Sequence, residues 1–321
     1  MAPPPPHRLI DFHSHYYSPA WYPFSSAQQS STLAQAWPLL TNIHSQLVAM
    51  DDAGIDAKVL SAPSALITAP GKRLPITMME RINDHFAALV AAEPRRLLAL
   101  ATIDAFQGDA AAREAERAIT SLGMGGICVD CAQGDSYLDA PEAHPTLETA
   151  VKLGVPVFVH PVNPPGLTER LAAKLDRTGY LLARGTETAA SVLALMRSGI
   201  FDELSSLKIV LPMIGAAAFL FAGIADYEYG PRGSWQGSLP SIARKRLYVD
   251  TMGFDPMTLR FAIELLGAEH VLLGSDWPIM PITTRRKIEE TLAALDLTDA
   301  QRAAILGGNT RQLLTQHVAL Q

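Results

Sequence analysis

Two histidines stand two residues apart near the start of the chain, in the run Leu9-Ile10-Asp11-Phe12-His13-Ser14-His15. Side chains alternate between the two faces of a β-strand, so residues spaced i and i+2 point the same way. Two imidazoles placed like this at the end of an apolar strand can bind one metal ion without distorting the backbone. A pair of unrelated surface histidines can share this spacing, so the prediction depends on further ligands elsewhere.

Two further candidate ligands also follow apolar runs. His160 ends the run Val157-Phe158-Val159-His160, and Asp276 follows Leu272-Leu273-Gly274-Ser275. Zn²⁺ favours such a set of nitrogen and oxygen ligands, and four of them leave a position for water or substrate. We therefore predict that His13, His15, His160 and Asp276 bind one divalent ion, with Zn²⁺ as the first expectation and Mn²⁺ as the alternative.

Short β-rich runs must position these ligands. Eight of them fall near residues 9–13, 57–61, 97–103, 126–130, 156–160, 208–212, 247–251 and 271–275, with helix-like segments between most of them. Thr77 with Glu80, and Thr298 with Gln301, match the capping-box pattern of helix starts. The alternation predicts an α/β protein with a single (β/α)8 TIM barrel over residues 8–321, whose chemistry lies at the carboxyl ends of the strands. We expect residues 1–7 to form a flexible Pro-rich leader, and residues 24–36 to form a lid-like loop inserted after the first strand.

Composition excludes several other classes of protein. The 321 residues are 48% hydrophobic and 18% charged, with a net charge of −6, which favours a large buried core and argues against a nucleic-acid partner. The start lacks a signal-peptide pattern, and the two cysteines, Cys128 and Cys131, suit a reducing cytoplasm. Cys128 lies in a strand-like run, so the pair is expected to be ordinary barrel residues. The apolar stretch 209–225 is interrupted by proline and glycine, which favours strand, turn and buried helix over a membrane span.

At these motifs the chain resembles the amidohydrolase superfamily, in the branch around aminocarboxymuconate semialdehyde decarboxylase and γ-resorcylate decarboxylase. The resemblance rests on five segments: Ile10-Asp11-Phe12-His13-Ser14-His15, Phe158-Val159-His160-Pro161, Leu247-Tyr248-Val249-Asp250, Leu273-Gly274-Ser275-Asp276-Trp277-Pro278, and residues 306–314. It implies one divalent ion on His13, His15, His160 and Asp276, a cytoplasmic protein and a homodimer. Binuclear members carry a lysine after the fourth strand, where this chain reads Val129-Asp130-Cys131-Ala132, so we expect a mononuclear site.

The chain departs from the family pattern after the sixth strand. Members there carry a histidine that acts as acid and base, whereas this chain reads Leu211-Pro212-Met213-Ile214-Gly215. A thioether cannot shuttle a proton, and general acid–base help is worth about 10²–10⁴-fold in rate. Three interpretations follow. Asp276 carries the proton as well as the metal, or His44 carries it, or the protein binds a ligand with little or no turnover.

The remaining candidate residues would surround a substrate. Tyr16, Tyr17 and Trp21 follow the first ligands and would wall a pocket for a planar molecule, and Trp277 follows the last ligand. Met213 would give an apolar floor, while Asn163 and Arg184 would contact a substrate carboxylate. By resemblance we predict metal-dependent, non-oxidative decarboxylation of a small aromatic or unsaturated carboxylate. The alternative is metal-dependent hydrolysis of an amide, lactone or ester, with Asp276 as the base.

Overall fold

Eight parallel strands form the centre of the computed structural model, which describes residues 7–21, 31–68, 72–215, 217–229 and 238–314. Their order is β1-β2-β3-β4-β7-β8-β9-β10. The last strand returns to the first, because Phe12 N donates to Leu273 O at 2.8 Å and Ser14 bridges Trp277. The strands are β1 (Ile10–His15), β2 (Ala57–Ser61), β3 (Leu97–Thr102), β4 (Gly126–Asp130), β7 (Val157–His160), β8 (Ile209–Leu211), β9 (Leu247–Asp250) and β10 (Val271–Leu272). The predicted (β/α)8 barrel is confirmed.

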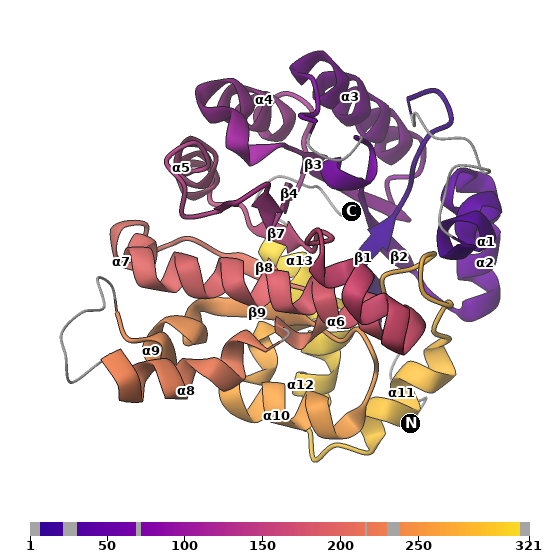
Figure 1. The fold of residues 1–321 in the computed structure, drawn as a ribbon. Helices are drawn as coiled ribbons and strands as arrows, with labels where there is room; N and C mark the ends of the chain where they lie inside the picture. The colour runs from indigo at the N-terminus through magenta and orange to yellow at the C-terminus, as the bar shows by residue number, and fades with distance from the viewer. Residues whose placement is uncertain (1–6, 22–30, 69–71, 216, 230–237, 315–321) are drawn as a thin grey trace.

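Helices surround the strands on all sides in Figure 1. They are α1 (Ser31–Leu40), α2 (Ile43–Ala53), α3 (Ile76–Ala92), α4 (Gly108–Thr120), α5 (His144–Leu153), α6 (Leu167–Ser198), α7 (Ile200–Glu203), α8 (Ala218–Tyr229), α9 (Pro240–Ala243), α10 (Pro256–Leu266), α11 (Arg285–Ala293), α12 (Asp299–Ala303) and α13 (Asn309–Leu314). A small antiparallel pair, β5 (Ala132–Gln133) and β6 (Ser136–Tyr137), follows β4. No helix within the described ranges combines the length and apolar character that crossing a membrane requires.

Three local expectations need correction. The insertion after the first strand is not one long loop, because α1 and α2 occupy it from Ser31 onward; residues 24–30 and the leader residues 1–6 lie outside the described part. The capping box at Thr298 and Gln301 is present, but α3 begins behind Pro75 without a side-chain cap. The helix after β8, α8, is not a buried helix: only Ala218, Phe219 and Ala222 of its twelve residues are buried.

Helix α6 is two segments joined by a break at Asp176, where φ is 48°. The segments approach so closely that a Cβ on Gly179 would lie 2.2 Å from the carbonyl oxygen of Leu171. Only glycine permits that distance between the two backbones. The break therefore depends on residue 179 and aligns the second segment, which carries Arg184.

The barrel interior is apolar along most of the strands and polar at their carboxyl ends, which form the mouth of the barrel. Interior side chains form one hydrophobic cluster of Ile10, Phe12, Ala57, Val59, Leu98, Leu100, Cys128, Phe158, Val210 and Leu272. By the alternation of side chains along a strand, the next inward position towards the carboxyl end is Ser61 in β2, Thr102 in β3, Asp130 in β4 and His160 in β7. All four are buried. The polar end of the interior lies where a barrel carries its chemistry.

Candidate metal centre

A bulge in β1 turns both of its histidines into the barrel. Asp11 pairs with Lys58 and Ser14 pairs with Leu60, so β1 has one residue more than β2 between these two positions. Such an extra residue re-aims the side chains that follow it. Phe12 already faces inward, yet the ring of His13 also lies inside, 4.8 Å from the interior ring of Phe158. Phe12 and His13 are the two bulged residues, which lets both face inward, and normal alternation from His13 onward places His15 on the same side.

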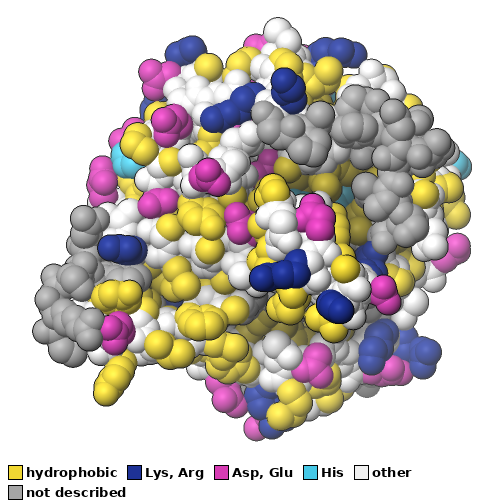
Figure 2. Space-filling view, viewed as in Figure 1, with side chains coloured by type: hydrophobic (Ala, Val, Ile, Leu, Met, Phe, Trp, Pro, Cys, Tyr) yellow, Lys and Arg dark blue, Asp and Glu magenta, His cyan; other side chains and the backbone are white. Residues whose placement is uncertain are grey.

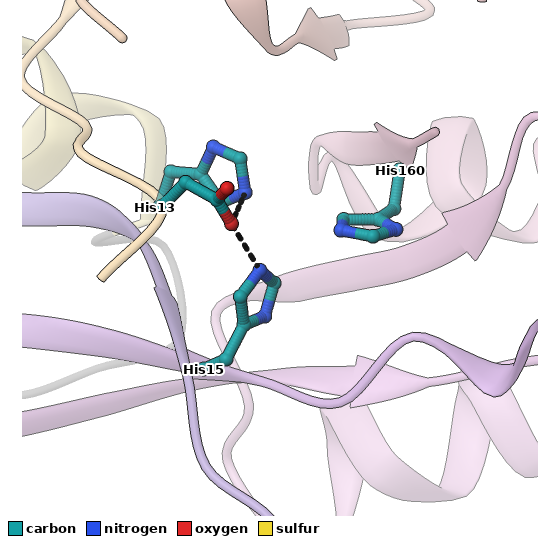
Figure 3. Close-up of side chains that lie close together, drawn as sticks. His13, His15 and His160 are labelled. Atoms are coloured by element: carbon teal, nitrogen blue, oxygen red, sulfur yellow. Dashed lines mark hydrogen bonds and ion pairs between the residues drawn. The ribbon is translucent and has the colours of Figure 1, made fainter. Parts of the chain in front are cut away.

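The four predicted ligands meet at the mouth. One ligand atom from each of His13, His15, His160 and Asp276 lies within 4.8 Å of the others. Asp276 Oδ1 lies 3.0 Å from His15 Nε2 and 3.5 Å from His13 Nε2, and the dashed lines in Figure 3 mark these contacts, with His160 facing them from β7. Metal–ligand distances of about 2.0–2.2 Å allow about 4.4 Å between opposite ligands of one ion. The cluster is close to the size that a single ion requires.

Hydrogen bonds from two neighbouring residues, Asp250 and Ser61, fix the orientation of the His13 and His15 rings. His13 Nδ1 lies 2.6 Å from Asp250 Oδ2, so Nδ1 carries the proton and Nε2 faces Asp276. Ser61 Oγ donates to the carbonyl oxygen of Ser14 and lies 2.9 Å from His15 Nδ1, which must then be the donor in that pair. Metal-binding histidines usually donate their other ring N–H in this way. The two networks leave both Nε2 atoms available to a cation.

The protonation states also suit a cation. Burial lowers the pKa of His15, and burial together with the charge of Arg184 lowers that of His160 well below its usual value, so both rings are neutral. Burial opposes the charge of His13 too, but its bond with Asp250 and the charge of Asp276 raise its pKa overall. Burial alone would raise the pKa of Asp276, but its hydrogen bond with His15 and the neighbouring positive charges outweigh that effect. The pKa of Asp276 is therefore lowered overall, and the side chain stays a carboxylate. Neutral imidazoles and a carboxylate are the forms that bind metal, so His15, His160 and Asp276 are ready to bind, whereas His13 would release a proton as a cation binds.

Two buried nitrogens in the cluster are left without hydrogen bonds. His13 Nε2 and His160 Nδ1 have no hydrogen-bond partner among the described residues. An unsatisfied buried polar atom costs about 1–3 kcal/mol, so natural proteins rarely tolerate several in one place. In addition, Asp276 has φ 62°, a left-handed conformation in which a non-glycine residue is strained. The orphaned atoms, the strain and the donor chemistry fit one divalent ion held by the four side chains.

The predicted aromatic wall lies only partly at this centre. Tyr17 is buried with its ring 6.4 Å from that of His15. Tyr16 instead stacks on His85 of α3 at 5.8 Å, and Trp21 packs against Tyr17 at 5.9 Å. Tyr16 and Trp21 therefore pack against other aromatic rings next to β1 and do not line the metal centre.

Trp277 lies in the layer between the strands and the outer helices. Lys58 Nζ stands 4.7 Å from the Trp277 ring and donates to Gln46 of α2, and Lys58 is fully buried. Because Val59 faces the barrel interior, its neighbour Lys58 faces outward. The structure therefore places Trp277 beside the outer helices rather than with the four ligands.

Of the remaining predicted substrate-binding and catalytic residues, some lie near the four ligands and one lies away from them. Arg184 of α6 is close enough for its charge to lower the pKa values of His160 and Asp276, and it donates to Asn163 Oδ1 at 3.0 Å. Met213 is half buried in the turn after β8. His44 is exposed on α2, whose buried face carries Gln46, two positions away and so on the opposite side. The structure does not bring His44 to the ligands.

Three buried polar residues of the mouth had no role assigned from sequence. Asp250 orients His13, Ser61 orients His15, and Asp130 is buried with its pKa raised by burial to about 7. Asp250 and Asp130 each close a strand in the way His160 does, so the same sequence signal could have found them. Cys128 and Cys131 are free and buried, which agrees with the expectation of ordinary barrel residues.

The barrel and its mouth define a metal-dependent (β/α)8 enzyme scaffold with a three-histidine, one-carboxylate centre. A family model described as "Amidohydrolase" matches residues 10–315. The chain belongs to this amidohydrolase family, and the resemblance drawn from the sequence is confirmed.

Curated relatives and solved structures of the family narrow the comparison. The γ-resorcylate decarboxylase of Rhizobium sp. (strain MTP-10005) is 32% identical over 289 residues, covering 84% of this chain and 85% of that protein. The 2-amino-3-carboxymuconate-6-semialdehyde decarboxylase of Dictyostelium discoideum is 24% identical and covers 81% of this chain and 73% of that protein. The dihydroxybenzoic acid decarboxylase of Polaromonas sp. JS666, solved with bound manganese and the inhibitor 2-nitroresorcinol, has a TM-score of 0.84 at 27% identity. It covers 96% of this chain and 97% of that one. These relatives are decarboxylases of the same superfamily.

Proposed function

We propose that this protein is a metal-dependent, non-oxidative decarboxylase of a small aromatic carboxylate. The observation that carries the proposal is the convergence of His13, His15, His160 and Asp276 at the barrel mouth, in a chain 32% identical to a γ-resorcylate decarboxylase. A divalent ion held there would act as a Lewis acid towards a substrate oxygen. The bond from the ring carbon to the carboxylate breaks, CO₂ leaves, and the electron pair left on the carbon takes up a proton.

Asp276 is our candidate for the proton carrier. It is a carboxylate in the folded protein, so it must first take up a proton, from the substrate or from water, before it delivers one to the ring carbon. Arg184 lies near enough to His160 and Asp276 to attract an anionic substrate to the mouth. Met213 supplies no proton, and its half-buried thioether leaves an apolar surface at the end of β8.

The test uses the metal-loaded protein with 2,6-dihydroxybenzoate and related hydroxybenzoates, and measures CO₂ and the decarboxylated product. We expect Asp276→Asn and His160→Ala to lower turnover at least 100-fold, while the surface variant His144→Gln keeps it. Loss of turnover in His44→Ala with retention in Asp276→Asn would assign the proton to His44 instead.

Two other outcomes would replace the proposal. Turnover of lactones or anilides without CO₂ release would make the protein a hydrolase. Tight binding of hydroxybenzoates without turnover, with activity gained on Met213→His, would make it a ligand-binding relative. Histidine is among the residues that tolerate the left-handed conformation found at position 213, where φ is 53°, so that variant should fold.

For the ion we propose Zn²⁺ or Mn²⁺. Three imidazoles and a carboxylate are a ligand set that Zn²⁺ accepts, whereas the Polaromonas structure is described with manganese. Elemental analysis of protein purified without added metal decides between them. We also propose a cytoplasmic location, supported by two cysteines that are free and buried. Fractionation of the native host tests it.

We further propose that two copies of the chain pair through α8. Leu220, Phe221, Ile224 and Tyr227 are 65%, 52%, 62% and 85% exposed, and Figure 2 shows hydrophobic side chains gathered over this helix. Contiguous apolar patches of several hundred Å² are uncommon on monomers, and a stable dimer buries about 800 Å² per partner. The groove beside these four exposed side chains is lined by both Arg197 and Glu228. The surface therefore carries a positive and a negative group that can pair when two copies meet face to face.

The mass of the protein in solution tests the dimer. Wild type should have twice the chain mass by light scattering, and Ile224→Glu should halve it. Met257→Glu places the same charge on a 69% exposed apolar site of α10 and should leave the dimer intact. A monomeric wild type, or a dimer that survives Ile224→Glu, contradicts this surface.

A further inference from the structure

Asp130 is a buried acid at the mouth that the metal ligands do not use. It ends β4, two positions after the interior residue Cys128, so its side chain faces into the barrel. In the sheet it pairs directly with His160 of β7. Neighbouring strands lie about 4.8 Å apart, so the backbone of Asp130 stands one strand away from that of a metal ligand.

Only one of its two oxygens is satisfied. Oδ2 accepts from the Ser64 hydroxyl and, at 2.8 Å, from the backbone N–H of Ala65, both in the short helix that follows β2. Oδ1 has no hydrogen-bond partner among the described residues, although Asp130 is only 3% exposed. Burial raises the pKa of Asp130 to about 7, so the group is ionised above that pH. An ionised carboxylate oxygen accepts hydrogen bonds and cannot donate them, so the empty position then calls for a donor.

The protein itself offers no such donor nearby. Within the described ranges, no Lys, Arg or His forms an ion pair with Asp130, and Arg184 acts on it only from a longer distance. The neighbouring acid at the end of β3, Asp104, is by contrast fully engaged. Its two oxygens accept from Arg73, Gln107 and the Phe106 backbone. Asp104 shows how a structural aspartate at this rim is satisfied.

We propose that Asp130 Oδ1 binds a hydroxyl group on the aromatic ring of the substrate, at the 3 or 4 position relative to the carboxylate that lies by the metal ligands. The inference rests on the proposed function and adds the substrate class. The substrate is a benzoate with a hydroxyl on the far part of its ring, beyond any hydroxyl adjacent to the carboxylate. Ser64 and Ala65 hold the acid in place, and the ring spans the distance from His160 to Asp130.

The experiment measures binding by calorimetry to the metal-loaded protein. The probes are benzoate and 2-, 3- and 4-hydroxybenzoate, and the variants are Asp130→Asn and the matched control Asp104→Asn. In wild type, 3- or 4-hydroxybenzoate should bind about 10- to 100-fold more tightly than benzoate, as expected for one hydrogen bond to a charged group. Asp130→Asn should remove most of this difference, and Asp104→Asn should keep it. Any gain from the 2-hydroxyl should be the same in all three proteins.

Asp130→Glu gives a second test if the asparagine variant folds poorly. It keeps the charge and moves both oxygens by one carbon–carbon bond, so the 3- or 4-hydroxyl preference should also fall. No such preference in wild type, or a preference that survives both changes at position 130, overturns the assignment while decarboxylation can still be observed. Failure of wild type both to bind and to decarboxylate any benzoate refutes the proposed function itself, and this inference with it.

Discussion

The pair of His13 and Asp250 gives the sharpest prediction about the metal centre. The two atoms lie 2.6 Å apart and both side chains are buried, so the bond fixes the ring with Nε2 towards Asp276. Asp250→Asn keeps the shape but replaces a charged acceptor with a neutral amide. Loss of such a partner typically weakens metal binding 10- to 100-fold, which is about 1.4–2.7 kcal/mol. We expect a loss in this range.

The assay is competition for Zn²⁺ and for Mn²⁺ between the protein and a chromophoric chelator of known affinity. The thermal unfolding midpoint, with and without metal, provides an independent measure of the same coupling. Asp255→Asn is the matched control, because Asp255 caps α10 and asparagine caps a helix equally well. If Asp250→Asn folds normally and binds both metals within twofold of wild type, our reasoning about ring orientation is refuted.

Three further predictions concern stability, each measured as the free energy of unfolding in urea. Burial lowers the pKa of Lys58 to about 7 from its usual 10.5, so the unfolded chain holds more protons than the folded chain between these two pH values. The free energy of unfolding should therefore rise with pH across this window by up to about 1.4 kcal/mol per pH unit, and Lys58→Met should remove that rise. Equal slopes of unfolding free energy against pH in the wild type and in Lys58→Met would contradict the prediction. Phe158→Ala empties the interior beneath the ligands and should cost about 3–5 kcal/mol; a loss below 1 kcal/mol would mean that the barrel repacks. Thr298→Ala removes the capping box of α12 and should cost about 1 kcal/mol, with Thr186→Ala on the exposed side of α6 as the comparison for a cap-free threonine.

Local patterns were sufficient for the barrel strands and for grouping the four candidate ligands. Buried parallel strands are continuous apolar runs, and residues at their carboxyl ends gather at one rim, so His13, His15, His160 and Asp276 could be grouped without coordinates. The helix that begins at Thr298 was predictable for a similar reason, since a capping box depends only on residues three apart.

Local patterns failed where a distant segment decides the outcome. The Thr77 and Glu80 pattern does not cap α3, because the chain enters that helix through Pro75. The apolar helix α8 was expected to be buried, yet hydropathy does not tell which face of a helix meets the barrel and which is left exposed. His44 follows the first loop in sequence, but the rotation of α2 turns it away from the mouth.

By itself the sequence determined the barrel and the placement of four candidate metal ligands at strand ends, because both follow from short-range periodicity and residue types, and its motifs were enough to indicate the family. Only the tertiary structure decided which side chains support those ligands. Asp250 reaches His13 across 237 positions of sequence, and Ser64 reaches Asp130 across 66. The physical reason is that a hydrogen bond requires its two atoms to lie within a few tenths of an ångström of the preferred separation, and no spacing along the chain encodes how closely two distant segments approach.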